Sequence, residues 1–402
     1  METPPFRVLS LLLVCATLGL PACRDRATPP TLDDDPVAWL EARLAERPGD
    51  GVLLYTLARY AERGGEPERA IVRLEELAST GWDGGIERKD FPTASSRPGF
   101  APVAERLDVL ELVVSRAAIE RELELPGLGP EGTAWDPQRG ELLLSSGIRR
   151  TAIAVDEAGH ARDLFPAARD GVFAVLGLEV DAARDRLWAA TTVAPFMDGF
   201  RAEDEGRSSL VSVDLARGEV VVVVETPLRP AMLNDLVVAG DGTVYVTDSA
   251  GGRIWKLPPG ASTLEPLEIH GEWIGPNGIA LAGDGRSLVV ADFLGLSRVD
   301  PATGEQRRLP LPDGVGSLGG IDGLDRHGAR LIGIQNVVGR GRVVRVELDQ
   351  NETRIASVEI LEAGNPHFVN PTTGAVAGDR FLFLANPAAD PGARLLLLNL
   401  PL

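Results

Sequence analysis

Four residues with carboxylate or amide side chains occupy equivalent places in a pattern that recurs along the chain. They are Glu131, Asn234, Asn277 and Asp322, and each opens a short apolar segment that a turn and a second apolar segment follow. Carboxylate and amide oxygens are the ligands that hard cations such as Ca²⁺, Mg²⁺ and Mn²⁺ prefer, with water filling the remaining positions. The four residues are therefore candidates for a divalent-cation site, if the fold brings them together.

Composition narrows the chemistry further. The chain has 402 residues, and its two cysteines, Cys15 and Cys23, both lie near its start, so the folded body has no cysteine for a disulfide, a zinc site or a nucleophile. It has four histidines, which are scattered. Acidic residues number 59 and basic residues 40, giving a net charge of −19. This net negative charge excludes electrostatic attraction to nucleic acid or to anionic lipid.

The recurring pattern indicates how the four residues are positioned. Each unit reads as a strand, a tight turn and a second strand, and most units continue into a third strand. Six units are found: EGTAWDPQRGELLLSS from Glu131, GLEVDAARDRLWAATT from Gly177, NDLVVAGDGTVYVTDS from Asn234, NGIALAGDGRSLVVAD from Asn277, DGLDRHGARLIGIQN from Asp322 and PTTGAVAGDRFLFLAN from Pro371. The repeat predicts a mainly β chain whose residues 118–402 form a six-bladed β-propeller. In such a ring the starts of the innermost strands converge on the central channel.

The ends of this region predict how the ring closes. The chain ends on RLLLLNLPL, a third strand with no fourth strand after it. The segment Ala118–Pro126 precedes the first unit and has no other strand to pair with. We expect it to complete the sixth blade, which would remove an exposed edge.

A small helical segment is predicted over residues 36–115, ahead of the propeller. Helices are expected from Pro36, over Val52–Arg63 and from Pro67, with a closing helix within 91–107. The segment resembles a single tetratricopeptide repeat through Leu57, Ala58, Tyr60, Gly65, Ala70 and Leu74. Two interpretations remain open: a helical cap on the propeller, which we favour, and a groove for a protein partner.

The first residues are typical of an export signal. Arg7 is followed by an apolar run, Val8–Leu20, that is too short to span a bilayer and suits a signal peptide over residues 1–22. Residues 23–35 read as a flexible tether. Leu20-Pro21-Ala22-Cys23 resembles a bacterial lipobox, although Pro21 departs from the usual small residue.

This resemblance implies that Cys23 carries a lipid and that the lipid is the protein's only membrane contact. The protein would be anchored in a bacterial cell envelope and face the periplasm or the exterior. The alternative is an ordinary secretory signal cleaved near Ala22, which would release a secreted protein.

The propeller region, Ala118–Leu402, resembles the regucalcin–gluconolactonase family. The matching motifs are E-G-x-x-W-D at Glu131–Asp136, N-D at Asn234-Asp235, P-N-G at Pro276–Gly278 and D-G at Asp322-Gly323. The resemblance implies that Glu131, Asn277 and Asp322 hold the metal. It also implies that Asp322 acts as the base and that Asn234 contacts the substrate or the metal's water. Met232 stands where these lactonases tend to have an arginine, so the substrate differs or is bound differently.

The sequence thus favours a divalent-metal-dependent hydrolase of lactones or related esters, with Asp322 and Asn234 as catalytic residues. The metal is Ca²⁺, Mg²⁺ or Mn²⁺. The alternative is a non-catalytic propeller that binds ligands or proteins, because a fold does not fix a function. A third alternative, a strictosidine-synthase-like propeller, is disfavoured by Asp322-Gly323. Gln335 and Asn336 are also expected near the seam of the sixth blade, within reach of the channel, with no role assigned.

Overall fold

The computed structural model describes residues 35–402 apart from 168, 338 and 388–391. It divides into two compact units. The first extends to Val113 and includes two short later segments, Gly314–Ser317 and Val337–Arg340. The second holds the rest of the chain from Val114 to Leu402. The predicted signal peptide, the tether up to residue 34 and the proposed lipid site Cys23 lie outside the described residues.

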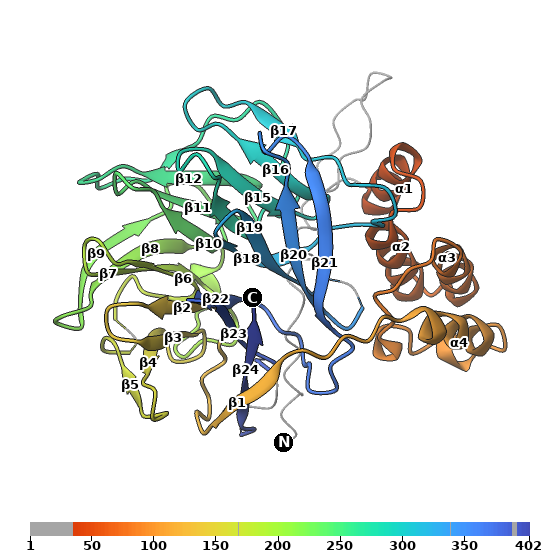
Figure 1. Cartoon of the computed structure of the whole chain (residues 1–402), viewed down its shortest axis with the longest axis horizontal. Coiled ribbons are helices and arrows are strands. Elements are labelled where there is room, and N and C mark those ends of the chain that lie inside the picture. The colour runs from red at the N-terminus through yellow and green to blue at the C-terminus, as the bar shows by residue number, and fades with distance from the viewer. Residues whose placement is uncertain (1–34, 168, 338, 388–391) are drawn as a thin grey trace. The chain divides into compact units, whose positions relative to one another are not determined.

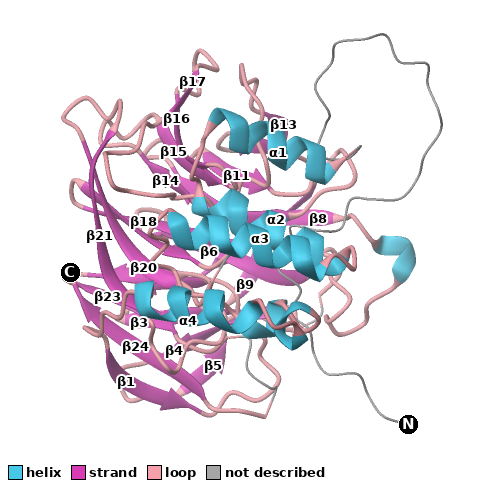
Figure 2. Ribbon diagram, turned by 90° about the vertical axis from the view of Figure 1, so that its right-hand side faces the viewer, coloured by secondary structure: helices cyan, strands magenta, loops and turns pink. Residues whose placement is uncertain are grey.

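The first unit is helical, as predicted (Figure 2). Its elements are α1 (Pro36–Glu46), α2 (Gly51–Arg63), α3 (Pro67–Ser79), η1 (Arg88–Asp90), η2 (Ala94–Ser96) and α4 (Phe100–Leu110). Asp35 and Asp50 cap the first two helices, and Pro36 and Pro67 occupy first-turn positions that need no donated N–H. Among the described residues, no helix combines the length and the apolar character that crossing a membrane requires.

The closing helix of this unit differs from the prediction for residues 91–107. A single 3-10 turn, η2, comes first, and α4 begins only at Phe100. The cause is Pro98, which disfavours helical geometry in the residue before it. Arg97 accordingly has an extended backbone, with φ −93° and ψ 143°.

The second unit is a six-bladed β-propeller of four-stranded antiparallel sheets, which confirms the predicted fold. In five blades the strands follow chain order from the inside outward, and Figure 1 shows the first strands toward the middle of the ring. The blades are β2 (Thr133–Asp136), β3 (Glu141–Ser146), β4 (Thr151–Val155), β5 (Ala161–Asp163); β6 (Ala174–Asp181), β7 (Arg186–Thr192), β8 (Ser208–Asp214), β9 (Glu219–Glu225); β10 (Leu233–Val238), β11 (Val244–Asp248), β12 (Arg253–Leu257), β13 (Glu265–Pro266); β14 (Ile279–Leu281), β15 (Leu288–Asp292), β16 (Gly295–Val299), β17 (Gln306–Arg308); and β18 (Ile321–His327), β19 (Arg330–Gln335), β20 (Arg342–Leu348), β21 (Ile355–Ala363). A 3-10 turn, η3 (Ala202–Asp204), lies between β7 and β8.

The sixth blade joins the two ends of the propeller sequence. It consists of β22 (Gly374–Ala377), β23 (Arg380–Leu384), β24 (Leu395–Pro401) and, on the outside, β1 (Ala118–Leu123). The pairing of β1 with β24 is the closure that the sequence predicts, and it runs from Ala118 opposite Asn399 to Leu123 opposite Leu395. Buried Leu123 packs in one apolar cluster with residues of the first and last blades. Closure therefore ties the first blade to the last.

Candidate functional site

Three of the four predicted site residues, Glu131, Asn277 and Asp322, precede glycines at which neighbouring innermost strands approach closely. A Cβ atom on Gly132 would lie 2.0 Å from the carbonyl oxygen of Leu176, and one on Gly278 would lie 2.8 Å from Cβ of Leu324. A Cβ atom on Gly323 would likewise lie 2.9 Å from atoms of Thr373. Only glycine avoids these overlaps. The E-G, N-G and D-G pairs thus combine a functional side chain with close packing of the blades.

Two of the site residues lie at β-bulges, which explains how they leave the regular strand pattern. Asp322 is an extra residue in β18, between the paired positions Ile321 and Gly323. Asn234 and Asp235 together oppose a single residue of β11, Thr247, whose hydroxyl contacts the Asp235 backbone. Bulges redirect side chains and are frequent beside functional sites.

Asp322 is the best-connected member of the site. Nδ2 of Asn277 donates to its Oδ1 at 2.5 Å, and Nδ2 of Asn336 donates to its Oδ2 at 2.6 Å. Burial raises the pKa of Asp322, and these two amides oppose that rise, so the pKa is about 6. In the metal-free protein at neutral pH, Asp322 is therefore mostly a carboxylate and able to accept a proton.

Glu131 lies close enough to Asp322 for the two carboxyl groups to interact electrostatically. Burial raises the pKa of Glu131 to about 8, and repulsion by Asp322 adds to the rise. Its backbone is fixed from two directions: the Glu131 N–H donates to Oγ of Ser145 at 3.0 Å, and Oγ1 of Thr372 donates to the Glu131 carbonyl at 2.6 Å. The structure therefore brings Glu131, Asn277 and Asp322 into one region of the propeller.

Asn234 is oriented separately. Its Nδ2 donates to Oγ of Ser249 at 3.2 Å, and that hydroxyl donates to the carbonyl of Pro276 at 2.7 Å. These two hydrogen bonds connect the third blade to Pro276, the residue before Asn277. Among the described residues, no hydrogen bond joins Asn234 to Glu131 or to Asp322.

Three further partly buried carboxyl groups belong to the innermost strands and were not predicted from the sequence: Glu179, Asp235 and Asp325. Oδ2 of Asp235 accepts the N–H of Ile279 at 3.1 Å, and Oδ2 of Asp325 accepts the N–H of Val376 at 2.8 Å. Each bond links one blade to the next. Burial raises all three pKa values, that of Asp235 to about 8. Asn336 is the other contributor, placed near the channel by the sequence but without a role.

These residues define what kind of cation fits. Within the described chain, no three side chains of Asp, Glu, His or Cys are grouped closely enough to hold a metal by themselves. A cation near Asp322 would need the two carboxylates Glu131 and Asp322, the amide oxygen of Asn277, and water. That set of oxygen donors suits a hard cation and not zinc.

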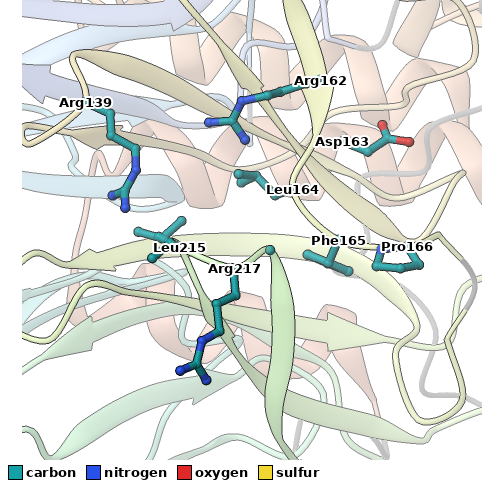
Figure 3. Close-up of a pocket in the computed structure, with 10 residues that line it drawn as sticks. Arg139, Arg162, Asp163, Leu164, Phe165, Pro166, Leu215 and Arg217 are labelled. Atoms are coloured by element: carbon teal, nitrogen blue, oxygen red, sulfur yellow. The ribbon is translucent and has the colours of Figure 1, made fainter.

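A cavity that none of these residues lines lies between the first two blades (Figure 3). Its volume is about 760 Å³, and its lining includes Arg139, Arg162 and Arg217. Two of these guanidinium groups are already paired: Arg139 with Asp136 and Asp185, and Arg162 with Glu141. Because most of its positive charge is neutralised, this cavity lacks the electrostatics of an anion site.

No protein-family model matches the sequence, and no curated protein matches it. Similar solved structures include a gluconolactonase from Xanthomonas campestris (19% identity, 71% of this chain and 89% of that chain, TM-score 0.49). They also include a calcium-binding regucalcin from Agrobacterium tumefaciens (20% identity, 72% and 95%, TM-score 0.48) and an aldose sugar dehydrogenase from Streptomyces coelicolor (15% identity, 71% and 97%, TM-score 0.49).

Gluconolactonases and regucalcin are thus among the structural neighbours, as the motifs predict. A sugar dehydrogenase with bound PQQ lies at the same level of similarity. What these proteins share with this chain is the propeller. The activity has to be argued from the site.

Proposed function

We propose that this chain is a hydrolase of lactones or related esters that depends on a divalent cation held by Glu131, Asn277 and Asp322. One observation carries the proposal. The carboxylate of Asp322 lies between the amides of Asn277 and Asn336, with the carboxyl group of Glu131 near enough to repel it. Two ionised carboxylates this close inside a protein are costly without a positive charge, so in the metal-free protein Glu131 keeps its proton at neutral pH.

The immediate surroundings of the two carboxyl groups supply no such charge. Within the described residues, neither Glu131 nor Asp322 forms an ion pair, and no cationic side chain contributes to the pKa of either group. A bound Ca²⁺, Mg²⁺ or Mn²⁺ ion would balance both carboxylates, polarise the carbonyl of an ester and lower the pKa of bound water.

The chain's own residues have distinct tasks in this proposal. Asp322 accepts the proton of the attacking water, a role that suits its pKa of about 6. Asn234 donates a hydrogen bond from its side-chain amide to the oxyanion that forms as the carbonyl is attacked. The Ser249 hydroxyl accepts a hydrogen bond from Nδ2 of Asn234 and so fixes the direction of that amide before substrate arrives.

A hydrolysis assay tests the proposal. Purified protein is treated with a chelator, supplied with each cation in turn and assayed on a panel of lactones and aryl esters. We expect turnover that requires a cation and that Asp322→Asn lowers at least about 100-fold, within the range for a general base. The matched control is Asp379→Asn, which changes a carboxyl group that is 95% exposed. Cation-independent turnover, or equal rates in both variants, contradicts the proposal and favours a non-catalytic binding propeller.

We also propose that the protein is exported and anchored through a lipid on Cys23. The support is the short apolar run before a lipobox-like sequence in a chain whose folded body has no cysteine. Radiolabelled palmitate should enter the wild type and not Cys23→Ala, and the variant should move from the membrane fraction to the soluble fraction. Unchanged partitioning of Cys23→Ala would overturn the anchor, and Cys15→Ala is the control for loss of a cysteine.

A further inference from the structure

Asn336 uses one side-chain amide to hold two separate groups. It follows β19 directly, and its Nδ2 donates to Oδ2 of Asp322 at 2.6 Å and to the carbonyl oxygen of Pro371 at 2.8 Å. An NH₂ group has two hydrogens, so each acceptor receives one. These two bonds determine the orientation of the amide. If its oxygen and nitrogen were exchanged, the amide oxygen would lie against two other acceptor oxygens, those of Asp322 and Pro371.

The residue before Asn336 keeps this part of the chain in place. Nε2 of Gln335 donates to the carbonyl of Gly319 at 2.6 Å, and Nε of Arg342 donates to Oε1 of Gln335 at 2.7 Å. Gln335 is buried. Asn336 therefore follows directly on a strand end whose last side chain, that of Gln335, is buried and hydrogen-bonded on both sides.

The carboxylate of Asp322 is held from both sides. Asn277, in the fourth blade, donates to one oxygen, and Asn336, in the fifth blade, donates to the other. Rotation of the carboxylate about its own axis would break both bonds. We propose that Asn336 is a positioning residue that fixes the Asp322 carboxylate in its working orientation and ties it to the sixth blade through Pro371. That orientation matters for catalysis only if the proposed function holds.

A purely structural role, stitching the fifth blade to the sixth, explains less. That seam already has other bonds: Gly323 N–H to the Thr372 carbonyl at 3.2 Å, and Val376 N–H to Asp325 Oδ2 at 2.8 Å. The bond from Asn336 to Pro371 is therefore one of several at this seam. What distinguishes Asn336 from these neighbours is its contact with Asp322.

The test compares full-length wild type with Asn336→Leu, which keeps the approximate shape and removes both donors. Asn336→Ser, which retains one donor, is the second variant in case the first does not fold. Asn386→Leu is the matched control, because among the described residues Nδ2 and Oδ1 of Asn386 bond to backbone groups alone, those of Arg394 and Leu396. It loses two hydrogen bonds without touching the site.

Two readouts are needed. In crystal structures, we expect the Asp322 side chain to leave its rotamer in Asn336→Leu and to keep it in Asn386→Leu. In calorimetric titrations with CaCl₂ and MnCl₂, we expect the Kd of Asn336→Leu to rise about 10–100-fold, as for other residues that orient metal ligands. Asn336→Ser should lie between the two, and Asn386→Leu should match wild type.

The readouts separate the two hypotheses. If Asp322 moves in Asn336→Leu but wild type binds no cation, the positioning role stands and the proposed function fails. If wild type binds cation and Asn336→Leu binds it equally, with Asp322 unmoved, the positioning role is overturned while the proposed function stands. A Kd that rises as much in Asn386→Leu as in Asn336→Leu would also overturn the positioning role.

Discussion

Asn277 donates its side-chain amide to Asp322 at 2.5 Å, although 45 residues separate the two in the sequence. Each precedes a glycine at which adjacent blades approach closely, Gly278 and Gly323. The contact therefore depends on the packing of the fourth blade against the fifth. Changes that separate the blades should disturb the site even when no site residue is altered.

Gly132→Ala tests how closely neighbouring blades pack. The new Cβ would overlap the carbonyl oxygen of Leu176 at 2.0 Å, so the first and second blades must separate. We expect a loss of about 1–3 kcal/mol in the free energy of unfolding, the usual range for overpacking. Denaturant unfolding measures it. Gly240→Ala is the control, since nothing lies within 4 Å of its Cβ position, and it should change stability by less than about 0.5 kcal/mol. Equal effects would refute the close-packing argument.

The raised pKa of Glu131 predicts a particular pH dependence of stability in metal-free protein. Its pKa is about 8 in the folded chain against an ordinary value of 4.5, so between these pH values the folded state keeps a proton that the unfolded state has lost. The stabilisation is complete below pH 4.5 and is lost as pH rises through about 8. Within this window the contribution falls by about 1.4 kcal/mol per pH unit.

Glu131→Gln removes this titration. With chelator present, the unfolding free energy of wild type should therefore decline relative to that of Glu131→Gln between about pH 5.5 and about pH 7.5. Parallel curves for the two proteins would show that Glu131 has an ordinary pKa. Glu157→Gln, at an exposed position, controls for the loss of a carboxylate.

The entry into the closing strand β1 is held by one buried carboxylate. Oε2 of Glu362 accepts the backbone N–H groups of Arg116 and Ala117, at 2.7 and 2.8 Å. Glu362→Ala leaves both donors without this acceptor, so we expect a loss of about 1–3 kcal/mol in unfolding free energy. Glu359→Ala, on the same strand, removes a 44%-exposed partner of Arg116 and should cost less than about 1 kcal/mol. A larger loss in Glu359→Ala than in Glu362→Ala would contradict this account of closure.

The sequence was sufficient to predict the six blades because local patterns mark each hairpin. It was sufficient to predict their closure because one strand is left over at each end of the propeller region. Repeated alternation and turns such as Gly240-Asp241-Gly242 mark each hairpin, and the unpaired segment at Ala118 has only one partner to find. The helix over 91–107 was predicted too early because Pro98 acts on the residue before it. The division into units also differs: Gly314–Ser317 and Val337–Arg340 belong with the helices. Arg340 forms an ion pair with Glu111 there, a contact that no local pattern reveals.

The site was predictable only in part. Motifs gave candidates, but the contacts depend on bulges that displace Asp322 and Asn234 from regular pairing. Asn336 contacts Asp322 because β19 ends beside that residue. Asp325 contacts Val376 of the next blade because it follows the bulge in β18. Asp325 belongs to no repeated motif position, and Asn336 ends the fifth unit where Asn386 ends the sixth, a position to which the repeat alone assigns no role. An acidic residue within an otherwise apolar innermost strand, as at Glu179, is the sequence signal that points to the additional carboxyl groups.

Calorimetric titration of the chelator-treated protein with Ca²⁺, Mg²⁺ and Mn²⁺ tests the central claim most directly. Wild type should bind one cation, and because Glu131 holds a proton near neutral pH, the measured heat should vary with the ionisation enthalpy of the buffer. Asp322→Ala should give no binding heat, whereas Asp379→Ala, at an exposed position, should match wild type. Negligible and equal heats for wild type and Asp322→Ala would contradict the cation site, and with it the proposed hydrolase.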